Sequence, residues 1–183
     1  MCGVDQLTTL ARDIDSTCRL TGNFTLRSGQ QVPEYFDKYV FESQPELLRR
    51  VAAAVVPLLP EDTDLLGGLE LGGVPIATMV SSPTGTPALF VRKAAKTYGT
   101  CRLAEGAEVA GRTVTLIEDV ITTGGAVRAA ALALRELGAR VHTVVCAIDR
   151  SPAGSRPLDD VAVAVRGGLT RDDLDRAHRS TAH

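Results

Sequence analysis

The stretch Leu116-Ile117-Glu118-Asp119-Val120-Ile121-Thr122-Thr123-Gly124-Gly125-Ala126 decides the fold that we predict. An apolar run over 114–117 precedes two adjacent carboxylates, and two threonines and two glycines separate these from an alanine-rich helical pattern. This order predicts a strand over 113–117, a turn, and a helix over 125–137. Backbone N–H groups at such a glycine turn, together with the positive end of the helix dipole, can hold an anion such as phosphate.

The carboxylates of Glu118 and Asp119 can accept hydrogen bonds from sugar hydroxyls or meet the water shell of a divalent cation. An ordinary strand–turn–helix with Asp119 as the helix N-cap is the simpler alternative. It does not explain why two carboxylates stand together after an apolar strand, at the edge where open α/β sheets bind ligands. Neither a dinucleotide fingerprint nor a P-loop pattern is present. The stretch therefore predicts a phosphosugar site.

Strands and helices alternate along most of the remaining sequence. We expect strands over 64–69, 88–91 and 141–148 and helices over 46–59 and 74–82, and this alternation predicts a parallel, doubly wound sheet. Residues 160–165 could add an edge strand, and Thr170-Arg171-Asp172-Asp173 predicts a capped C-terminal helix. The first forty residues do not join the alternation: they predict a helix over 5–20 and short strands over 24–26 and 35–41.

Bulk properties exclude several classes of protein. The chain has 183 residues and a net charge of −2, so we expect one domain and no general attraction to nucleic acid or to anionic membranes. The sequence has neither a secretory signal pattern nor an apolar run long enough for a membrane span, and we expect a cytoplasmic protein. Four widely spaced cysteines and three histidines do not suggest a zinc site.

Five further segments accompany the acidic stretch: Phe24–Gly29, Tyr35–Asp37, Glu70–Pro75, Val91–Thr100 and Ile148–Arg150. Together they resemble the type I phosphoribosyltransferases, which use phosphoribosyl diphosphate (PRPP), and among these the orotate phosphoribosyltransferase family. The block Arg92-Lys93-Ala94-Ala95-Lys96-Thr97-Tyr98-Gly99 is the most specific part. The resemblance implies the type I phosphoribosyltransferase fold, an α/β fold with a parallel sheet flanked by helices and a small N-terminal hood. It implies a single domain over 1–183, with the hood elements within 1–43.

The resemblance also implies transfer of the phosphoribosyl group of PRPP to orotate, giving orotidine 5′-monophosphate and pyrophosphate, with Lys96 and Asp119 as catalytic residues. Mg²⁺ is the implied cofactor, carried by the diphosphate, with no metal site on the protein. The implied PRPP-binding residues are Leu71, Gly72, Arg92, Lys93, Lys96, Tyr98, Glu118, Asp119, Thr122, Thr123, Gly124, Gly125 and Ala126. The basic loop is expected to reach the neighbouring subunit, so a homodimer with shared active sites is the implied assembly.

Orotate is a planar carboxylate, and an arginine offers both a fork of donors for the carboxylate and a flat face for stacking. The expected orotate-binding residues are Arg27, Tyr35, Phe36, Thr122 and Arg150. Arg27 stands where the family commonly has lysine, and Tyr98 where many members have histidine. Some members also place a lysine in the loop over 70–75, which has none here, so the basic block is expected to neutralise more of the diphosphate. A transferase for another base and a PRPP-sensing regulator without turnover are the alternatives.

Overall fold

The computed structural model describes residues 2–25, 28–94 and 103–181. Among these residues, the central sheet has six strands in the order β5-β4-β3-β6-β7-β8. Their bounds are Leu65–Leu69 (β3), Ala88–Val91 (β4), Ala104–Glu105 (β5), Val114–Ile121 (β6), Thr143–Asp149 (β7) and Ala164–Thr170 (β8). All neighbouring pairs are parallel except β4 and β5. The predicted parallel sheet is therefore confirmed, with a short antiparallel strand added at one edge.

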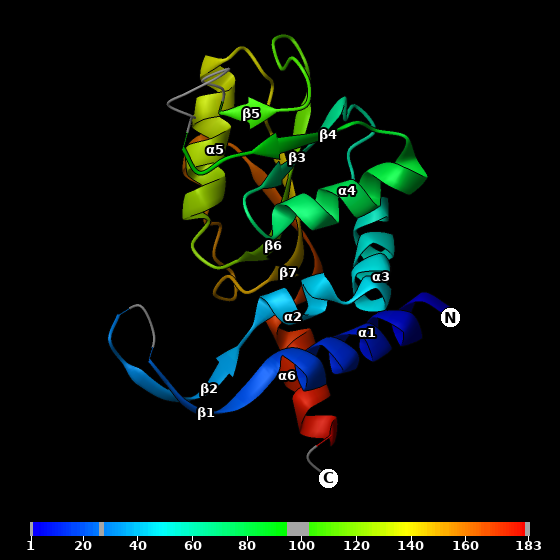
Figure 1. Cartoon of the computed structure of the whole chain (residues 1–183), viewed down its shortest axis with the longest axis vertical. Helices are drawn as coiled ribbons and strands as arrows, with labels where there is room; N and C mark the ends of the chain where they lie inside the picture. Colours follow the sequence, from blue (N-terminus) through cyan, green and yellow to red (C-terminus); the bar gives the residue numbers. More distant parts are fainter. Residues whose placement is uncertain (1, 26–27, 95–102, 182–183) are drawn as a thin grey trace.

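Helices cover both faces of the sheet (Figure 1). Helices α3 (Pro45–Val55) and α4 (Gly73–Thr84) lie on one face, and α5 (Gly125–Glu136) lies on the other. Successive strand residues point to opposite faces, so Leu116 packs in the core under α5 whereas Ile117 packs in the core under α3 and α4. This burial on both faces explains the continuous apolar run that identified the strand in the sequence.

The strand order reverses between β3 and β6. The chain passes from β3 to β4 on one side, and from β6 through β7 to β8 on the other. Pairing of β3 with β6 ends at Gly68 and Ile117, but pairing of β6 with β7 continues to Ile121. The predicted end of the strand at Ile117 was therefore wrong, because β7 keeps the strand extended for four more residues. Glu118 and Asp119 consequently lie within β6, beside the gap that β3 leaves.

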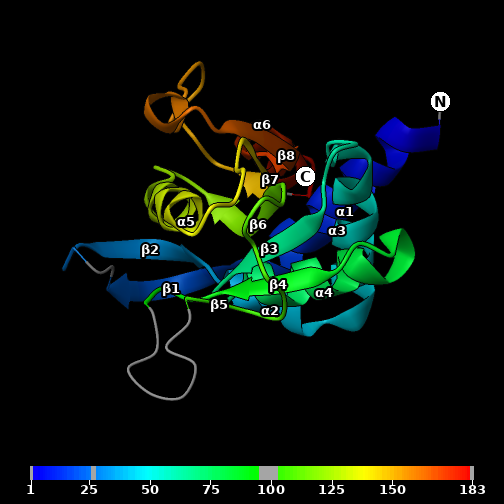
Figure 2. The same ribbon diagram turned by 90° about the horizontal axis from the view of Figure 1, so that it is seen from above.

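The N-terminal segment forms a separate layer of α1 (Cys2–Cys18), the antiparallel pair β1 (Arg19–Thr25) and β2 (Gln31–Phe36), and α2 (Lys38–Ser43). The hairpin projects away from the sheet in both views (Figures 1 and 2). The predicted strand over 35–41 was wrong beyond Phe36. The Asp37 side chain accepts a hydrogen bond from the Tyr39 N–H at 3.1 Å and caps a helix there, which outweighs the alternating apolar pattern.

Other boundaries also differ from the prediction. The first helix ends at Cys18, and the chain continues as β1 instead of reaching residue 20 as a helix. The edge strand predicted over 160–165 begins only at Ala164, because the 3₁₀ helix η2 (Asp159–Val161) and a left-handed Ala162 precede it. The predicted C-terminal helix, α6 (Arg171–Thr181), is confirmed with its cap, since Thr170 Oγ1 accepts a hydrogen bond from the Asp173 N–H. A 3₁₀ helix, η1 (Val56–Leu58), follows α3.

Across residues 2–25, 28–94 and 103–181, no helix has the length and apolar character needed to cross a membrane.

Replacing Gly68 with alanine is expected to lower the free energy of unfolding by roughly 1–3 kcal/mol, the usual cost of overpacking a core. A Cβ atom at position 68 would lie 2.7 Å from the Gly73 carbonyl oxygen and 2.9 Å from Ala77 Cβ, so α4 would have to move away from β3. Gly125→Ala is the control, because its Cβ would meet only Thr123 Oγ1 at 3.9 Å. Urea denaturation measures both variants, and wild-type stability of Gly68→Ala would contradict this packing.

Candidate active site

Asp119 is the most buried acidic side chain at the carboxyl end of β6. It is 0% exposed, and the neighbouring Glu118 is 8% exposed. Backbone donors face both carboxylates, because the Asp119 N–H donates to Glu118 Oε1 at 3.0 Å and the Val120 N–H donates to Asp119 Oδ1. The acidic pair is thus held rigidly by the strand itself.

Two residues of helix α2, which the sequence analysis did not assign to the site, lie beside Asp119. The Lys38 ammonium nitrogen is 2.6 Å from Asp119 Oδ2. Glu42, one helical turn further along, is 8% exposed. The contact of Asp119 Oδ2 with Lys38 is an ion pair. Asp119 Oδ2 and Glu42 Oε1 are both buried, and neither oxygen has a hydrogen-bond partner. The i, i+4 spacing of Lys38 and Glu42 behind the Asp37 cap is the sequence signal that could have identified them.

The loop between β3 and α4 approaches this group through its glycines. A Cβ atom on Gly72 would lie 1.8 Å from Asp119 Oδ2 and 2.5 Å from Glu42 Oε1, and one on Gly73 would lie 2.2 Å from the Ile117 carbonyl oxygen. Both positions therefore require glycine. Leu71, the other residue that the sequence assigned to PRPP in this loop, is 60% exposed.

The expected phosphate loop follows β6 directly. Thr122, Thr123, Gly125 and Ala126 are exposed, whereas Gly124 is buried in a left-handed conformation with φ of 72°. Its missing side chain leaves room for Leu158, whose Cδ2 atom would lie 2.7 Å from a Cβ. The Arg128 N–H bonds to the Gly124 carbonyl at the start of α5, so the N–H groups of Gly125 and Ala126 precede the helical hydrogen-bond ladder. These N–H groups are suited to an anion.

Only part of the basic block lies within the described residues. The Lys93 N–H donates to Glu70 Oε2 at 3.0 Å, which ties the end of β4 to the β3–α4 loop. Nε of Arg92 is buried without a hydrogen-bond partner. Lys96 and Tyr98, as well as Arg27 of the expected orotate site, lie outside the residues that the structure describes.

Phe36 and Arg150 come together on the side of the expected base. The Arg150 guanidinium carbon lies 5.3 Å from the centre of the Phe36 ring, and the Arg150 N–H donates to the Ile121 carbonyl at 2.8 Å. Burial, and then the nearby guanidinium groups of Arg171 and Arg19, lower the pKa of Arg150. Tyr35 does not share this contact: its ring lies 5.5 Å from that of Phe24 and is 42% exposed.

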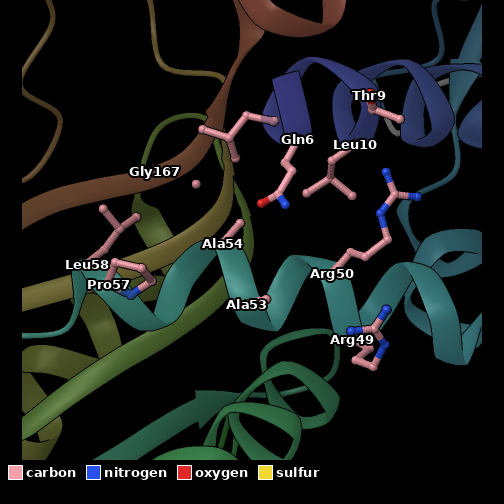
Figure 3. A pocket seen from close by; sticks show the side chains of 12 residues that line it. Gln6, Thr9, Leu10, Arg49, Arg50, Ala53, Ala54, Pro57, Leu58 and Gly167 are labelled. Atoms are coloured by element: carbon pink, nitrogen blue, oxygen red, sulfur yellow. The ribbon is translucent and has the colours of Figure 1, made fainter. Parts of the chain in front are cut away.

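A separate cavity of about 780 Å³ lies between α1 and α3 (Figure 3). Two arginines line it, but both are paired: Arg49 with Glu46 at 2.7 Å and Arg50 with Asp13 at 2.8 Å. Of the residues predicted to bind substrate, those that the structure describes do not line this cavity. The carboxyl edge of the sheet between β3 and β6 is therefore the better candidate for the active site.

Comparison with known proteins identifies the family of this chain. Residues 42–173 match the family model of the phosphoribosyl transferase domain. An orotate phosphoribosyltransferase of Nocardioides sp. is 71% identical over 174 residues, which make up 95% of this chain and 97% of that protein. The match with the relative thus includes the N-terminal segment that the family model leaves out.

Solved structures agree with the sequence matches. Orotate phosphoribosyltransferase of Mycobacterium tuberculosis H37Rv, in complex with Fe(III) dicitrate, superposes with a TM-score of 0.81 and 30% identity over 92% of this chain and 98% of that chain. A complex of the same enzyme with PRPP gives a TM-score of 0.76 at 27% identity, covering 93% and 99% of the two chains. The chain therefore belongs to the phosphoribosyltransferase family and, within it, to the orotate phosphoribosyltransferases.

Proposed function

We propose that this protein is a pentosyltransferase that moves the phosphoribosyl group of PRPP to orotate, giving orotidine 5′-monophosphate and pyrophosphate in pyrimidine biosynthesis. The 71% identity to an orotate phosphoribosyltransferase over nearly the whole chain carries this proposal. The site is consistent with it, because the carboxyl edge between β3 and β6 combines an anion-binding helix start with a buried carboxylate. A location in the cytoplasm is part of the same proposal.

In the proposed reaction, the N–H groups that open α5 hold the 5-phosphate and Asp119 accepts hydrogen bonds from the ribose hydroxyls. The anomeric C–O bond breaks and its electron pair leaves with the diphosphate. A ring nitrogen of orotate forms the new bond and loses its proton. Positive charge develops on the ribose in the transition state, and the fixed carboxylate of Asp119 stabilises it electrostatically. Arg92, Lys93 and Lys96 are the proposed cations for the diphosphate, and Phe36, Arg150 and Thr122 the proposed contacts of orotate.

The protonation state of the carboxyl groups decides which of them carries charge. Burial, followed by the proximity of Asp119, raises the pKa of Glu118 to about 8 and that of Glu42 to about 8. Burial also opposes the charge of Asp119, but contacts with Lys38, Glu118 and the Val120 N–H outweigh it, and the pKa of Asp119 is lowered. At neutral pH the ligand-free site thus holds one carboxylate, on Asp119, flanked by two protonated carboxyl groups.

Mg²⁺ is the proposed cofactor. It would arrive bound to the diphosphate of PRPP, whose oxygens suit this cation, and would stabilise charge on the leaving group. Within the described ranges, no group of three or more His, Cys, Asp or Glu side chains could hold a metal ion.

Purified protein given PRPP and Mg²⁺ is expected to consume orotate, which the loss of orotate absorbance measures, and to leave adenine, guanine, uracil and xanthine unchanged. EDTA should abolish turnover and added Mg²⁺ should restore it, with little change in melting temperature without PRPP. Turnover of another base in preference to orotate would contradict the proposed acceptor. PRPP binding without turnover of any base would instead favour a sensor.

Replacing Glu42 with glutamine is expected to stabilise the protein at pH 8 by about 1 kcal/mol or more. Because folding raises the pKa of Glu42 from 4.5 to about 8, the stability that its proton contributes is complete below pH 4.5 and is lost as the pH rises through 8. Thermal unfolding measured from pH 4.5 to about pH 8 should show a smaller loss of stability with rising pH in Glu42→Gln than in the wild type. Glu46→Gln, at an exposed position, serves as the control and should keep the wild-type dependence of stability on pH. An unchanged dependence in Glu42→Gln would refute the raised pKa of Glu42.

Mixing two inactive variants tests the proposed homodimer with shared sites. Lys96→Ala lacks the loop cation and Asp119→Asn lacks the carboxylate, so a mixed dimer has one site with both residues intact if the loop serves the neighbouring subunit. Random exchange makes about half of the dimers mixed, and activity should return to about a quarter of wild type. Absence of recovery after verified subunit exchange would mean that Lys96 acts in its own subunit or that the protein works as a monomer.

A further inference from the structure

The loop that follows β3 lies against Asp119 but brings no cation to it. Residues Glu70 to Gly73 contain no basic side chain. Any side chain at position 72 would collide with the carboxyl oxygens of Asp119 and Glu42, since the first carbon would already lie 1.8 Å from one and 2.5 Å from the other. A cation for the substrate on this side of the site must therefore come from another element.

Helix α2 provides such a cation, the ammonium group of Lys38. Lys38 is the first residue of that helix, and the Asp37 cap fixes its starting direction. Its side chain is 35% exposed, whereas the Asp119 side chain that it contacts at 2.6 Å is 1% exposed. Burial opposes the charge of Lys38, but the contact with Asp119 outweighs it and raises the pKa of Lys38. The ammonium group therefore stays charged at the boundary between the buried carboxylate and the open side of the site.

The residue type is also unusual for this chain. Of its 20 basic residues only three are lysines, and the other two, Lys93 and Lys96, belong to the basic block. A lysine carries a compact charge on a flexible stem with three donors, which can change partners more easily than the planar fork of an arginine. That property suits a group that holds a carboxylate in the free protein and a phosphate in the complex.

Substrate geometry places the breaking bond near this ammonium group. If the ribose hydroxyls bind Asp119, the anomeric carbon is one bond away from the carbon that carries the 2-hydroxyl. The diphosphate leaves from that anomeric carbon, only a few bonds from the hydroxyls that would bind Asp119, and the Lys38 ammonium group is 2.6 Å from the same carboxylate. The ribose hydroxyls also take over hydrogen bonds to the Asp119 carboxylate, which lets the ammonium group turn to a new anion.

Building on the proposed function, we propose that Lys38 is a further substrate-binding residue. In the free protein its ammonium group neutralises Asp119, and in the complex it contacts the diphosphate of PRPP or the released pyrophosphate. It would supply on this side of the site the positive charge that the loop after β3 lacks in this chain.

Titration calorimetry with magnesium pyrophosphate tests the contact directly, without turnover. Lys38→Met is expected to weaken pyrophosphate binding by about ten- to a hundredfold, the effect of losing a hydrogen bond to a charged group. Lys38→Arg should recover part of the affinity, and the KM for PRPP should rise more than that for orotate. Arg50→Met is the matched control, because it removes the cation of another close ion pair, with Asp13 at 2.8 Å, away from the site.

A second pair of variants separates contact with the substrate from an effect through Asp119. Lys38→Met alone leaves a buried carboxylate unpaired, which could prevent folding. Comparing Asp119→Asn with the Asp119→Asn/Lys38→Met double variant avoids this, since neither leaves an unpaired charge on Asp119. Pyrophosphate affinity at least about tenfold lower in the double variant supports the proposal. Equal affinities overturn it and make Lys38 a partner of Asp119 only, whereas a wild-type protein that binds neither PRPP nor pyrophosphate would refute the proposed function itself.

Discussion

The proposed site depends on keeping one carboxylate charged inside the protein. Asp119 has no exposure to solvent, and burial of a lone carboxylate normally removes its charge by raising the pKa. Here Lys38 and the Val120 N–H compensate the lost hydration, so the pKa of Asp119 is lowered instead. Two neighbouring carboxyl groups, with pKa values of about 8, hold protons in consequence. The charge of the site is thereby concentrated on one side chain, which is held in place by its strand.

This arrangement requires glycines at the end of β3 and in the loop that follows it. Gly68 and Gly73 let α4 pack directly on the sheet, and Gly72 leaves the space that the Asp119 and Glu42 carboxyl groups occupy. Because Gly72 lies so close to these carboxyl groups, position 72 cannot carry a charged side chain toward Asp119. The glycines of β3 and its loop therefore provide the close packing. The N-terminal layer provides the positive charge that balances Asp119, through Lys38.

The sequence was sufficient for the sheet, because apolar runs such as that ending at Ile117 are buried on both faces and are easy to recognise. It failed where long-range pairing or a local cap decides the structure. Nothing local to Glu118 indicates that β7 keeps the strand extended to Ile121. At Asp37, a single capping hydrogen bond turns an alternating pattern into a helix.

The prediction of site residues was limited in the same way. Residues in contiguous motifs, such as Thr122 to Ala126, could be proposed from the sequence because spacing along the chain defines that loop. Lys38 and Glu42 were missed because they act on Asp119, about eighty positions away in the chain, and only the folded arrangement brings α2 to β6. Roles that depend on Lys96, Tyr98 and Arg27 rest on sequence alone.

The turn from β2 into α2 connects the two halves of the proposed substrate. Phe36 contacts Arg150 at the end of β7, and two residues later Lys38 contacts Asp119 in the neighbouring strand β6. Asp37, between them, uses its side chain for the helix cap, which fixes the direction of both neighbours. The proposed base pocket and the proposed ribose pocket are therefore completed by one short rigid segment, and a shift of the N-terminal layer would disturb both together. Correct placement of orotate relative to the anomeric carbon would then follow from the docking of this segment on two adjacent strands.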